Sequence, residues 1–444
     1  MKLLQDYASP LPGLLKDQRL REGESYRLMH FVVQLPVDEG LLLYNVMSRA
    51  VALLSSEEAR KVADNPASIP ELVSRWFAVP LNHDDRKLAR EVRAVGRMLE
   101  KRPEGITGFT ILTTTDCNAR CFYCYEKGRS RISMKEETAL KVAEFIIRNH
   151  AAGKVKLLWF GGEPLFNKGV ISLICDKLRR AGVDYQSSMI SNGYLFDDDT
   201  VSEAIGPWNL KRVQITLDGT EEVYNRSKAF VRPETSPYRR VLSNIHCLLD
   251  AGIKVSIRLN IGRHNADDLL DLADILTHEF GGQKLLGVYS HTLFETGSEM
   301  EAVSQHRELF DARMKLQEKL REGKFAQEGS LPDQLKLNRC MADRDDDVII
   351  LPDGRLGKCE HYSEDHCFGS IDSPERDETL LAEFKRLREE LDACADCPFY
   401  PDCYRLTQCE EAAHCYPEER EEKRLTTLRN LSDFYQKKKD EVSD

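Results

Sequence analysis

Residues 109–125 read FTILTTTDCNARCFYCY, an apolar run followed at once by three closely spaced cysteines. Cys117, Cys121 and Cys124 have the spacing C-x3-C-x2-C, which puts three thiolates on one loop. A structural zinc site closes with four ligands, whereas a [4Fe-4S] cube held by three cysteines leaves one iron open. The loop therefore indicates chemistry at a cluster. The alternatives are half of a zinc site completed by a distant ligand, or a redox-active trio.

A second motif follows after one predicted helix and one predicted strand. The apolar strand Val155 to Phe160 ends in Gly161-Gly162-Glu163-Pro164. Together with the cysteine loop, this GGEP motif resembles the signature of radical S-adenosylmethionine (SAM) enzymes, a match between motif and context. The resemblance implies that the amino and carboxylate groups of SAM chelate the open iron. It also implies that Tyr123 flanks the adenine and that the GGEP motif receives the SAM amino group.

Strands and helices alternate between residues 108 and 320, which predicts an α/β fold with a parallel sheet. We expect strands near 108–115, 155–162, 185–192, 211–218, 254–261 and 284–290, and helices such as 135–149, 168–181, 238–251 and 266–279. This order resembles the partial (β/α)6 barrel of radical SAM proteins. In such barrels functional residues gather at the carboxyl ends of the strands.

Polar side chains stand at the ends of the third, fourth and fifth predicted strands. By the resemblance, Ser191 and Asn192 approach the methionine or ribose of SAM. Arg258, with Asn260 beside it, approaches the carboxylate or ribose, and Asp218 orients either ligand. The Asn-Gly and Asp-Gly pairs in these segments are also ordinary turn dipeptides.

Eight of the thirteen cysteines lie between residues 340 and 415, and such a density indicates metal in a reducing compartment. Two zinc sites are the conservative interpretation. The order of the cysteines resembles the SPASM domain of radical SAM enzymes that act on peptides, although five residues separate Cys403 from Cys409 where that family has three. We expect Cys175 and Cys247 to be inert buried thiols. The resemblance implies one auxiliary [4Fe-4S] cluster on Cys340, Cys359 and Cys409, with either Cys367 or an open iron as the fourth position, and a second on Cys394, Cys397, Cys403 and Cys415.

The first hundred residues predict two short strands, His30 to Leu35 and Gly40 to Tyr44, and helical segments over 50–57, 69–77 and 84–101. A hairpin with small helices resembles the winged-helix, PqqD-like element by which peptide-modifying enzymes recognise a leader peptide. A helical cap is the alternative. The expected domains are 1–100 for recognition, 101–325 for the barrel, 326–416 for the iron-sulfur domain, and 417–444 for a C-terminal helix.

The charge and hydropathy of the sequence argue against nucleic acid and membrane as partners. The net charge of −11 argues against nucleic acid, which is bound by clustered Lys and Arg. No segment approaches the roughly 18 apolar residues of a membrane span. The first residues lack the apolar core of a signal peptide, so we expect a cytoplasmic protein.

As a whole, the chain resembles a radical SAM/SPASM peptide maturase. The resemblance implies three [4Fe-4S] clusters, SAM, a precursor peptide with a leader, and an external one-electron reductant such as flavodoxin or ferredoxin. A 5'-deoxyadenosyl radical would take a hydrogen from the peptide, and a cross-link would close, with a Cys thioether as the favoured product.

One residue supports a different product. Glu360 follows Cys359 at the position where related sulfatase-maturing enzymes have a general base, so formylglycine formation is an alternative. A surface carboxylate on a hairpin explains Glu360 equally well. The remaining alternatives are a carbon-carbon or carbon-oxygen link, epimerisation, and a non-catalytic metal-binding peptide scaffold.

Overall fold

The computed structural model describes residues 1–7, 15, 18–99, 103–293, 299–325, 331–332, 335, 340–360, 366–386, 388–403, 405 and 414–443. The chain forms two compact units. The terminal unit comprises Met1–Lys101, Glu328–Cys340 and Arg386–Asp444, and the sheet unit comprises Arg102–Gln327 and Met341–Lys385. In the part of the chain that is described, no helix is both long and apolar enough to span a membrane.

The sheet unit is built on six parallel strands that follow one another in chain order. They are β7 (Gly108–Thr114), β8 (Val155–Gly161), β9 (Tyr185–Ser191), β10 (Leu210–Thr216), β11 (Lys254–Ile261) and β12 (Leu286–Thr292). All seven residues of β7 are buried, as expected for a strand covered on both faces of a parallel sheet. The six predicted strands are confirmed.

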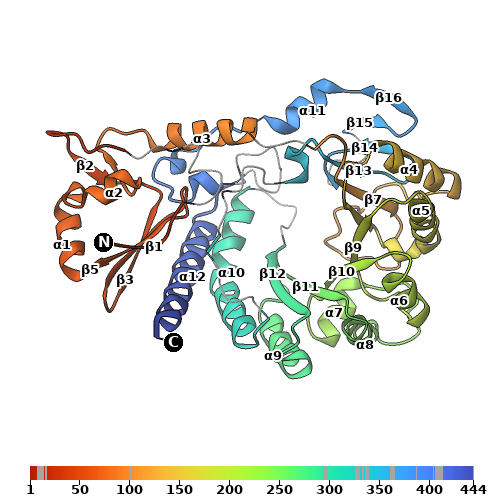
Figure 1. Cartoon of the computed structure of the whole chain (residues 1–444). Coiled ribbons are helices and arrows are strands. Elements are labelled where there is room, and N and C mark those ends of the chain that lie inside the picture. The colour runs from red at the N-terminus through yellow and green to blue at the C-terminus, as the bar shows by residue number, and fades with distance from the viewer. Residues whose placement is uncertain are drawn as a thin grey trace. The chain divides into compact units, whose positions relative to one another are not determined.

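Helices line one side of this curved sheet (Figure 1). The unit contains α4 (Glu136–Asn149), η3 (Pro164–Asn167), α5 (Lys168–Arg180), α6 (Asp198–Ile205), α7 (Glu221–Lys228), α8 (Pro237–Asp250), α9 (Asp268–Phe280) and α10 (Glu299–Glu322). The four predicted helices are confirmed as α4, α5, α8 and α9. Trp159 and Trp208 are among the largest fully buried side chains of the core between helices and sheet.

The sheet continues past β7 with residues from much later in the chain. Strand β13 (Asp347–Ile350) pairs with β7 in parallel, and β14 (Arg355–Gly357), β15 (Cys367–Ser370) and β16 (Ser373–Arg376) follow antiparallel. The predicted hairpin that leads to Cys359 is therefore confirmed, and it extends the main sheet. Two short helices flank it, η4 (Met341–Asp343) and α11 (Glu378–Lys385).

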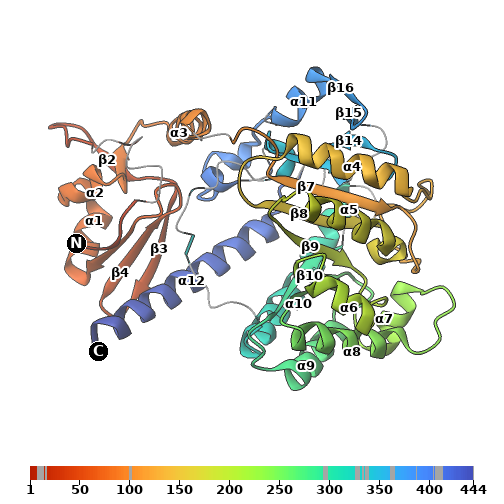
Figure 2. The same ribbon diagram turned by 45° about the vertical axis from the view of Figure 1, so that its right-hand side comes forward.

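The terminal unit has an antiparallel sheet in the order β1-β5-β4-β3 and a separate pair β2-β6. The strands are β1 (Lys2–Gln5), β2 (Tyr26–Leu28), β3 (Val32–Val37), β4 (Gly40–Asn45), β5 (Val51–Ser55) and β6 (Ala78–Pro80). The helices are α1 (Ser56–Asp64), η2 (Pro66–Ser68), α2 (Pro70–Ser74), α3 (Asp85–Leu99), η6 (Asp392–Cys394), η7 (Tyr400–Asp402) and α12 (Pro417–Ser443). Figure 2 shows α12 running beside the sheet near β3.

Two N-terminal predictions are corrected. The predicted helix over 50–57 is wrong at its start, because Val51–Ser55 is strand β5, paired with both β1 and β4. A short apolar run fits a buried strand as well as a helix. The helix begins at Ser56, where Ser55 and Glu58 form a capping box. The predicted helix over 69–77 is only the five-residue α2, and Trp76 beyond it takes a positive φ of 61°.

The two isolated cysteines differ in exposure. Cys175 is fully buried on α5, as predicted. The prediction for Cys247 is wrong, because this thiol is exposed. Helix α8 buries Ile245 and Leu248 instead, and this leaves Cys247 on the outward side.

Candidate functional site

The cysteine loop follows β7 directly and folds back on itself. The Cys124 amide donates to the Cys121 carbonyl at 3.2 Å, and the Ala119 amide donates to the Cys117 sulfur at 3.4 Å. Burial raises the pKa of Cys117 to about 12, and the nearby charges of Glu163, Cys121 and Cys124 contribute. The Cys117 thiol is therefore close enough to Cys121 and Cys124 for their charges to affect its pKa. Metal binding at this loop has to release their protons, because only the thiolates are ligands.

The glycines of the GGEP motif let β8 approach this loop closely. Gly161 has a φ of +125°, and a Cβ added there would lie 2.1 Å from the Thr114 carbonyl oxygen. A Cβ on Gly162 would lie 2.3 Å from the Asp116 carbonyl oxygen. The amides of Gly162 and Glu163 donate to these same two carbonyls, each at 3.0 Å. Larger residues would therefore push the end of β8 away from the cysteine loop.

Glu163 joins the end of β8 to the end of β9. Its side chain is fully buried and accepts hydrogen bonds from the Ser191 hydroxyl at 2.9 Å and the Asn192 amide at 2.8 Å. The Leu165 amide donates to it at 3.1 Å. Burial raises the pKa of Glu163 to about 7 despite these hydrogen bonds. Pro164, the last residue of the motif, is buried and starts η3.

Asn192 connects the third strand to the cysteines. Its side-chain nitrogen lies 3.8 Å from the Cys117 sulfur and 2.7 Å from the Asn118 side-chain oxygen. The predicted gathering of strand ends around the cysteine loop is therefore correct at this position.

A buried ion pair lies beside Tyr123. The Lys228 ammonium is 2.9 Å from Asp218 Oδ2 and donates to the Tyr123 hydroxyl at 2.8 Å, and this hydroxyl donates in turn to Asp218. Both charged side chains are almost completely buried. Burial alone lowers the pKa of Lys228, but the Asp218 charge and the groups around it outweigh burial and hold it well above its ordinary value.

Lys228 was missed by sequence reasoning, because a lysine in the last turn of a helix ordinarily complements the helix dipole in solvent. Here α7 ends at Lys228, and Ala229 in the left-handed region follows it. The Lys228 and Ala229 carbonyls accept the Arg120 amide at 2.9 Å and 3.1 Å, which ties this turn to the cysteine loop.

The fourth and fifth strand ends are joined by amides. Asp218 accepts from the Asn260 amide at 3.2 Å, and Arg258 donates to the Asn260 side chain at 2.9 Å. The buried Asn265, also missed from the sequence, donates to the carbonyls of both Asp218 and Asn260. The predicted polar residues of these strands thus form one connected group.

Glu360 lies next to the cysteine loop. Its carbonyl accepts from Arg129 at 3.2 Å. Burial of the Tyr125 hydroxyl raises its pKa, and the charges of Glu126 and Glu360 raise it further. The role of Glu360 as a base stays a prediction.

The late cysteines divide between the two units. Cys394, Cys397, Cys403 and Cys415 belong to the terminal unit, as does Cys340, whereas Cys359 and Cys367 belong to the sheet unit. Burial raises the pKa of both Cys394 and Cys397, and the charges of Cys403 and Cys415 raise them further. Cys409 lies outside the described residues. Within those residues, no three His, Cys, Asp or Glu side chains are arranged to hold a single metal ion.

Comparison with known proteins identifies the central segment. Residues 111–276 match the model of the radical SAM superfamily, in agreement with the resemblance of the cysteine loop and the GGEP motif to that family. GTP 3',8-cyclase from Clostridium perfringens is 29% identical over 181 residues, 40% of this chain and 54% of that protein. The chain thus spans about half the length of the curated relatives it matches.

Two solved structures share the fold over a longer range. The structure of anSMEcpe with bound AdoMet aligns with a TM-score of 0.58 and 14% identity, covering 74% of this chain and 95% of anSMEcpe. Streptococcus suis SuiB aligns with a TM-score of 0.51 and 13% identity, covering 88% of this chain and 98% of SuiB. At this identity the likeness is one of fold. The PqqD-like element and the SPASM domain stay predictions.

Proposed function

We propose that this protein is a radical SAM enzyme that modifies a ribosomally made precursor peptide by closing an intramolecular cross-link, a thioether from a Cys to an unactivated carbon. The observation that carries the proposal is the convergence of the three cysteine thiols with Glu163 and the buried Lys228–Asp218 pair at one edge of the parallel sheet. This edge is where barrels of this kind hold reacting groups.

The residues at this edge fit a [4Fe-4S] cluster and SAM. Cys117, Cys121 and Cys124 would hold the cluster, because three thiols within electrostatic reach leave one iron for another ligand. Lys228, whose charge Asp218 compensates, would hold the Tyr123 hydroxyl in place. When bound, the cluster and SAM supply a 5'-deoxyadenosyl radical that takes a hydrogen atom from the substrate.

The chain's own residues position these groups and keep water away. Gly161 and Gly162 permit the close approach of β8 to the cysteine loop, and Glu163 fixes the end of β9. Asp218 holds the Tyr123 hydroxyl, and so fixes the ring that the family resemblance sets against adenine. Preorganised polar groups of this kind need no rearrangement at the moment of reaction.

The cysteines between residues 340 and 415 support the proposal that the protein holds two auxiliary clusters. Cys394, Cys397, Cys403 and Cys415 would hold one auxiliary cluster, since four thiols influence one another there. Cys340, Cys359 and Cys409 would hold another, with Cys367 or a substrate thiolate at the fourth iron. The domain boundaries at residues 100, 325 and 416, the flavodoxin-type or ferredoxin-type reductant and the cytoplasmic location are part of the same proposal.

The peptide substrate is supported by the named ligands of the structural neighbours. SuiB has been solved bound to its precursor peptide SuiA, and anSMEcpe bound to the Cp18Cys peptide. For this chain we propose that the N-terminal sheet receives the leader by strand addition at an exposed edge.

A second candidate function is formylglycine formation, favoured by the position of Glu360 beside Tyr125 and Arg129 of the cysteine loop. A carboxylate at that place can serve as a general base. The name of the curated relatives also makes GTP a substrate to test.

Co-expression with a precursor encoded beside this chain tests the proposal. A thioether formed from a C–H and a thiol removes two hydrogens: the deoxyadenosyl radical would take one as an atom, and the thiol would lose the other as a proton while an auxiliary cluster accepts the remaining electron. The peptide therefore loses about two mass units, and the joined Cys no longer reacts as a thiolate with an alkylating agent. A loss of two units with every Cys still reactive would indicate a carbon-carbon or carbon-oxygen link. An unchanged mass would indicate epimerisation, and a formylglycine would support the second candidate. Turnover of GTP without any change to the peptide would overturn the proposal.

A further inference from the structure

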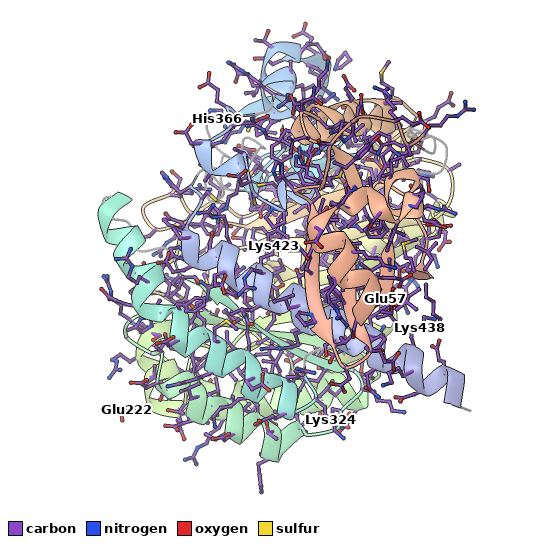
Figure 3. All side chains as sticks on the ribbon, turned by 90° about the vertical axis from the view of Figure 1, so that its left-hand side faces the viewer. Glu57, Glu222, Lys324, His366, Lys423 and Lys438 are labelled. Carbon is purple, nitrogen blue, oxygen red and sulfur yellow. The ribbon has the colours of Figure 1, made fainter. Side chains whose placement is uncertain are left out.

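The segment that carries Cys394, Cys397 and Cys403 contributes to the hydrophobic core of the terminal unit. Phe399 and Tyr400 are buried together with residues of β3, β4 and β5, and the three cysteines pack against the same core. The Tyr400 ring stacks on Phe31 with centroids 6.2 Å apart. The Lys423 ammonium of α12, labelled in Figure 3, lies 4.9 Å from the centre of the Phe399 ring on another side.

Arg49 is the polar contact at the centre of this packing. Its side chain is 1% exposed and donates to Asp402 Oδ2 at 2.6 Å, to the Val46 carbonyl at 2.8 Å and to the Tyr44 hydroxyl at 3.2 Å. Asp402 is the last residue of η7, and Cys403 follows it directly. The arginine therefore fixes the turn from which the Cys403 thiol projects.

The turn that presents Arg49 is itself constrained. Arg49 has a φ of +65°, an uncommon conformation for a residue with a side chain. Its amide donates to the Asn45 carbonyl at 2.8 Å, and Gln5 donates to its carbonyl at 2.7 Å. A non-glycine residue persists in this region when its surroundings over-determine it, and such positions are concentrated at functional sites.

Cys403 is also held by a second arginine. Arg93 of α3 donates to the Cys403 carbonyl at 3.4 Å. The start of the same helix, η7, is fixed in a similar way, because Tyr400 donates to Glu390 at 2.6 Å and Arg86 donates to the same carboxylate at 3.0 Å. Arg49, Arg86 and Arg93 of the first hundred residues thus each contact the cysteine-rich segment.

We infer that Arg49 is a positioning residue for the proposed iron-sulfur cluster of Cys394, Cys397, Cys403 and Cys415, and that the first hundred residues therefore support this cluster in addition to their proposed role in binding the peptide. The inference rests on the proposed function for the metal site itself. Partners that orient the ligands of a metal determine affinity, and their loss costs about 10–100-fold. Removal of Arg49 breaks the ion pair that ties Asp402, the residue before Cys403, to the turn between β4 and β5.

The test uses the full-length reconstituted protein and measures how much iron each variant retains against a competing chelator. Arg49→Met keeps the volume of the side chain and removes its charge. Asp402→Asn removes the other charge and leaves the bonds of Arg49 to Val46 and Tyr44 available. We expect both variants to release the iron of this site at about 10–100-fold lower chelator concentration than the wild type. Deoxyadenosine formed at the cysteine loop is followed in the same samples.

The matched control is Arg27→Met. Arg27 makes a partly buried ion pair with Asp85 at 2.9 Å in the same unit, and the bonds that it makes end on residues 28, 81, 83 and 85. We expect this variant to keep its iron. Equal iron loss in Arg27→Met and Arg49→Met would show that lower stability of the unit causes the loss, and it would overturn the inference. Unchanged iron retention in Arg49→Met would also overturn it. Should Arg49→Met fail to fold by circular dichroism, Asp402→Asn decides the outcome by the same criterion.

A variant with Ser at positions 394, 397, 403 and 415 identifies the iron that belongs to the site. Iron content equal to that of the wild type would overturn the metal site and the inference together. The proposed radical chemistry is judged separately, since it would fail through absent deoxyadenosine in the wild type.

Discussion

Two sulfur-rich regions of this molecule assemble by different means. The cysteine loop after β7 takes its partners from the ends of neighbouring parallel strands, as with Asn192 and Asp218. The segment around Cys403 takes its partners from far along the chain, since Arg49 and Arg93 precede the residues they bind by 353 and 310 positions. The partners of the first region follow from local sequence spacing and sheet topology, whereas those of the second depend on tertiary packing.

Both regions contain a buried cation that is paired with a carboxylate. Lys228 pairs with Asp218 in the sheet unit, and Arg49 pairs with Asp402 in the terminal unit. A buried charge is stable only with a good partner, so each pair makes its surroundings specific. Both cations were missed from the sequence, because nothing distinguishes a buried Lys or Arg from a solvated one before the fold is known.

The largest effect is expected from removing the sulfurs of the cysteine loop. The triple variant with Ala at 117, 121 and 124 should lose all reductive cleavage of SAM, because the proposed SAM-binding cluster would lose its three protein ligands. The auxiliary clusters should remain, since the other cysteines are untouched. The measurement is deoxyadenosine by chromatography, together with iron content. Continued cleavage of SAM by the triple variant would show that the cysteine loop does not hold the SAM-binding cluster, and the comparison of the two regions would then fail.

A smaller effect is expected from breaking the Lys228–Asp218 pair. Lys228→Met leaves Asp218 buried with no cation, which costs about 3–5 kcal/mol of unfolding free energy. We also expect weaker SAM binding, because the Tyr123 hydroxyl loses the hydrogen bond from Lys228. Denaturant unfolding and equilibrium binding of SAM measure the two effects.

The same helix provides the control for Lys228. Arg226 pairs with Glu222, labelled in Figure 3, at 3.6 Å, with side chains 65% and 88% exposed. Arg226→Met should change stability by less than about 1 kcal/mol. Similar losses in the two variants would show that burial of the pair is not the cause.

Much of the sheet unit could be predicted from the sequence, and the reason is physical. Its strands are apolar runs bounded by turn residues, and the carboxyl ends of parallel strands must meet at one edge, so Glu163, Ser191 and Asp218 could be placed there in advance. The strand β5 was mistaken for helix because four apolar residues carry no periodicity. The contacts of Arg49 and Lys228 could not be predicted, since they depend on which distant segments pack together.

The terminal unit should be the more acid-sensitive region, because of Asp85. Burial raises the pKa of this carboxyl, but hydrogen bonds from His83, Arg27 and the His30 backbone lower it more, to about 2. The unfolded pKa is about 3.9, so the folded pKa is depressed and the carboxylate stabilises the fold above that pH by roughly 2–3 kcal/mol. This contribution is lost as the pH falls from about 4 towards 2.

Urea unfolding of the metal-free full-length protein at pH 7, 5 and 3 measures this contribution. The difference in unfolding free energy between the wild type and Asp85→Asn should be nearly constant at pH 7 and 5 and smaller at pH 3. A difference that does not change with pH would show that the carboxylate acts through packing, and the proposed acid sensitivity of this unit would then be wrong.

The smallest effect tests how closely β8 must approach the cysteine loop. In Gly162→Ala the added methyl group would lie 2.3 Å from the Asp116 carbonyl oxygen, so the backbone has to move, at a typical cost of about 1–3 kcal/mol. Gly169 is the matched control, because it lies in α5 and a Cβ there meets nothing within 4 Å. Gly169→Ala should stabilise by about 0.5–1 kcal/mol, since alanine is the better helix former. Thermal unfolding should therefore shift in opposite directions, and only Gly162→Ala should lose iron at the loop. If both variants lower the melting temperature alike and keep their iron, the glycine pair is not what brings β8 to the cysteines, and this site would depend on distant packing just as the Cys403 segment does.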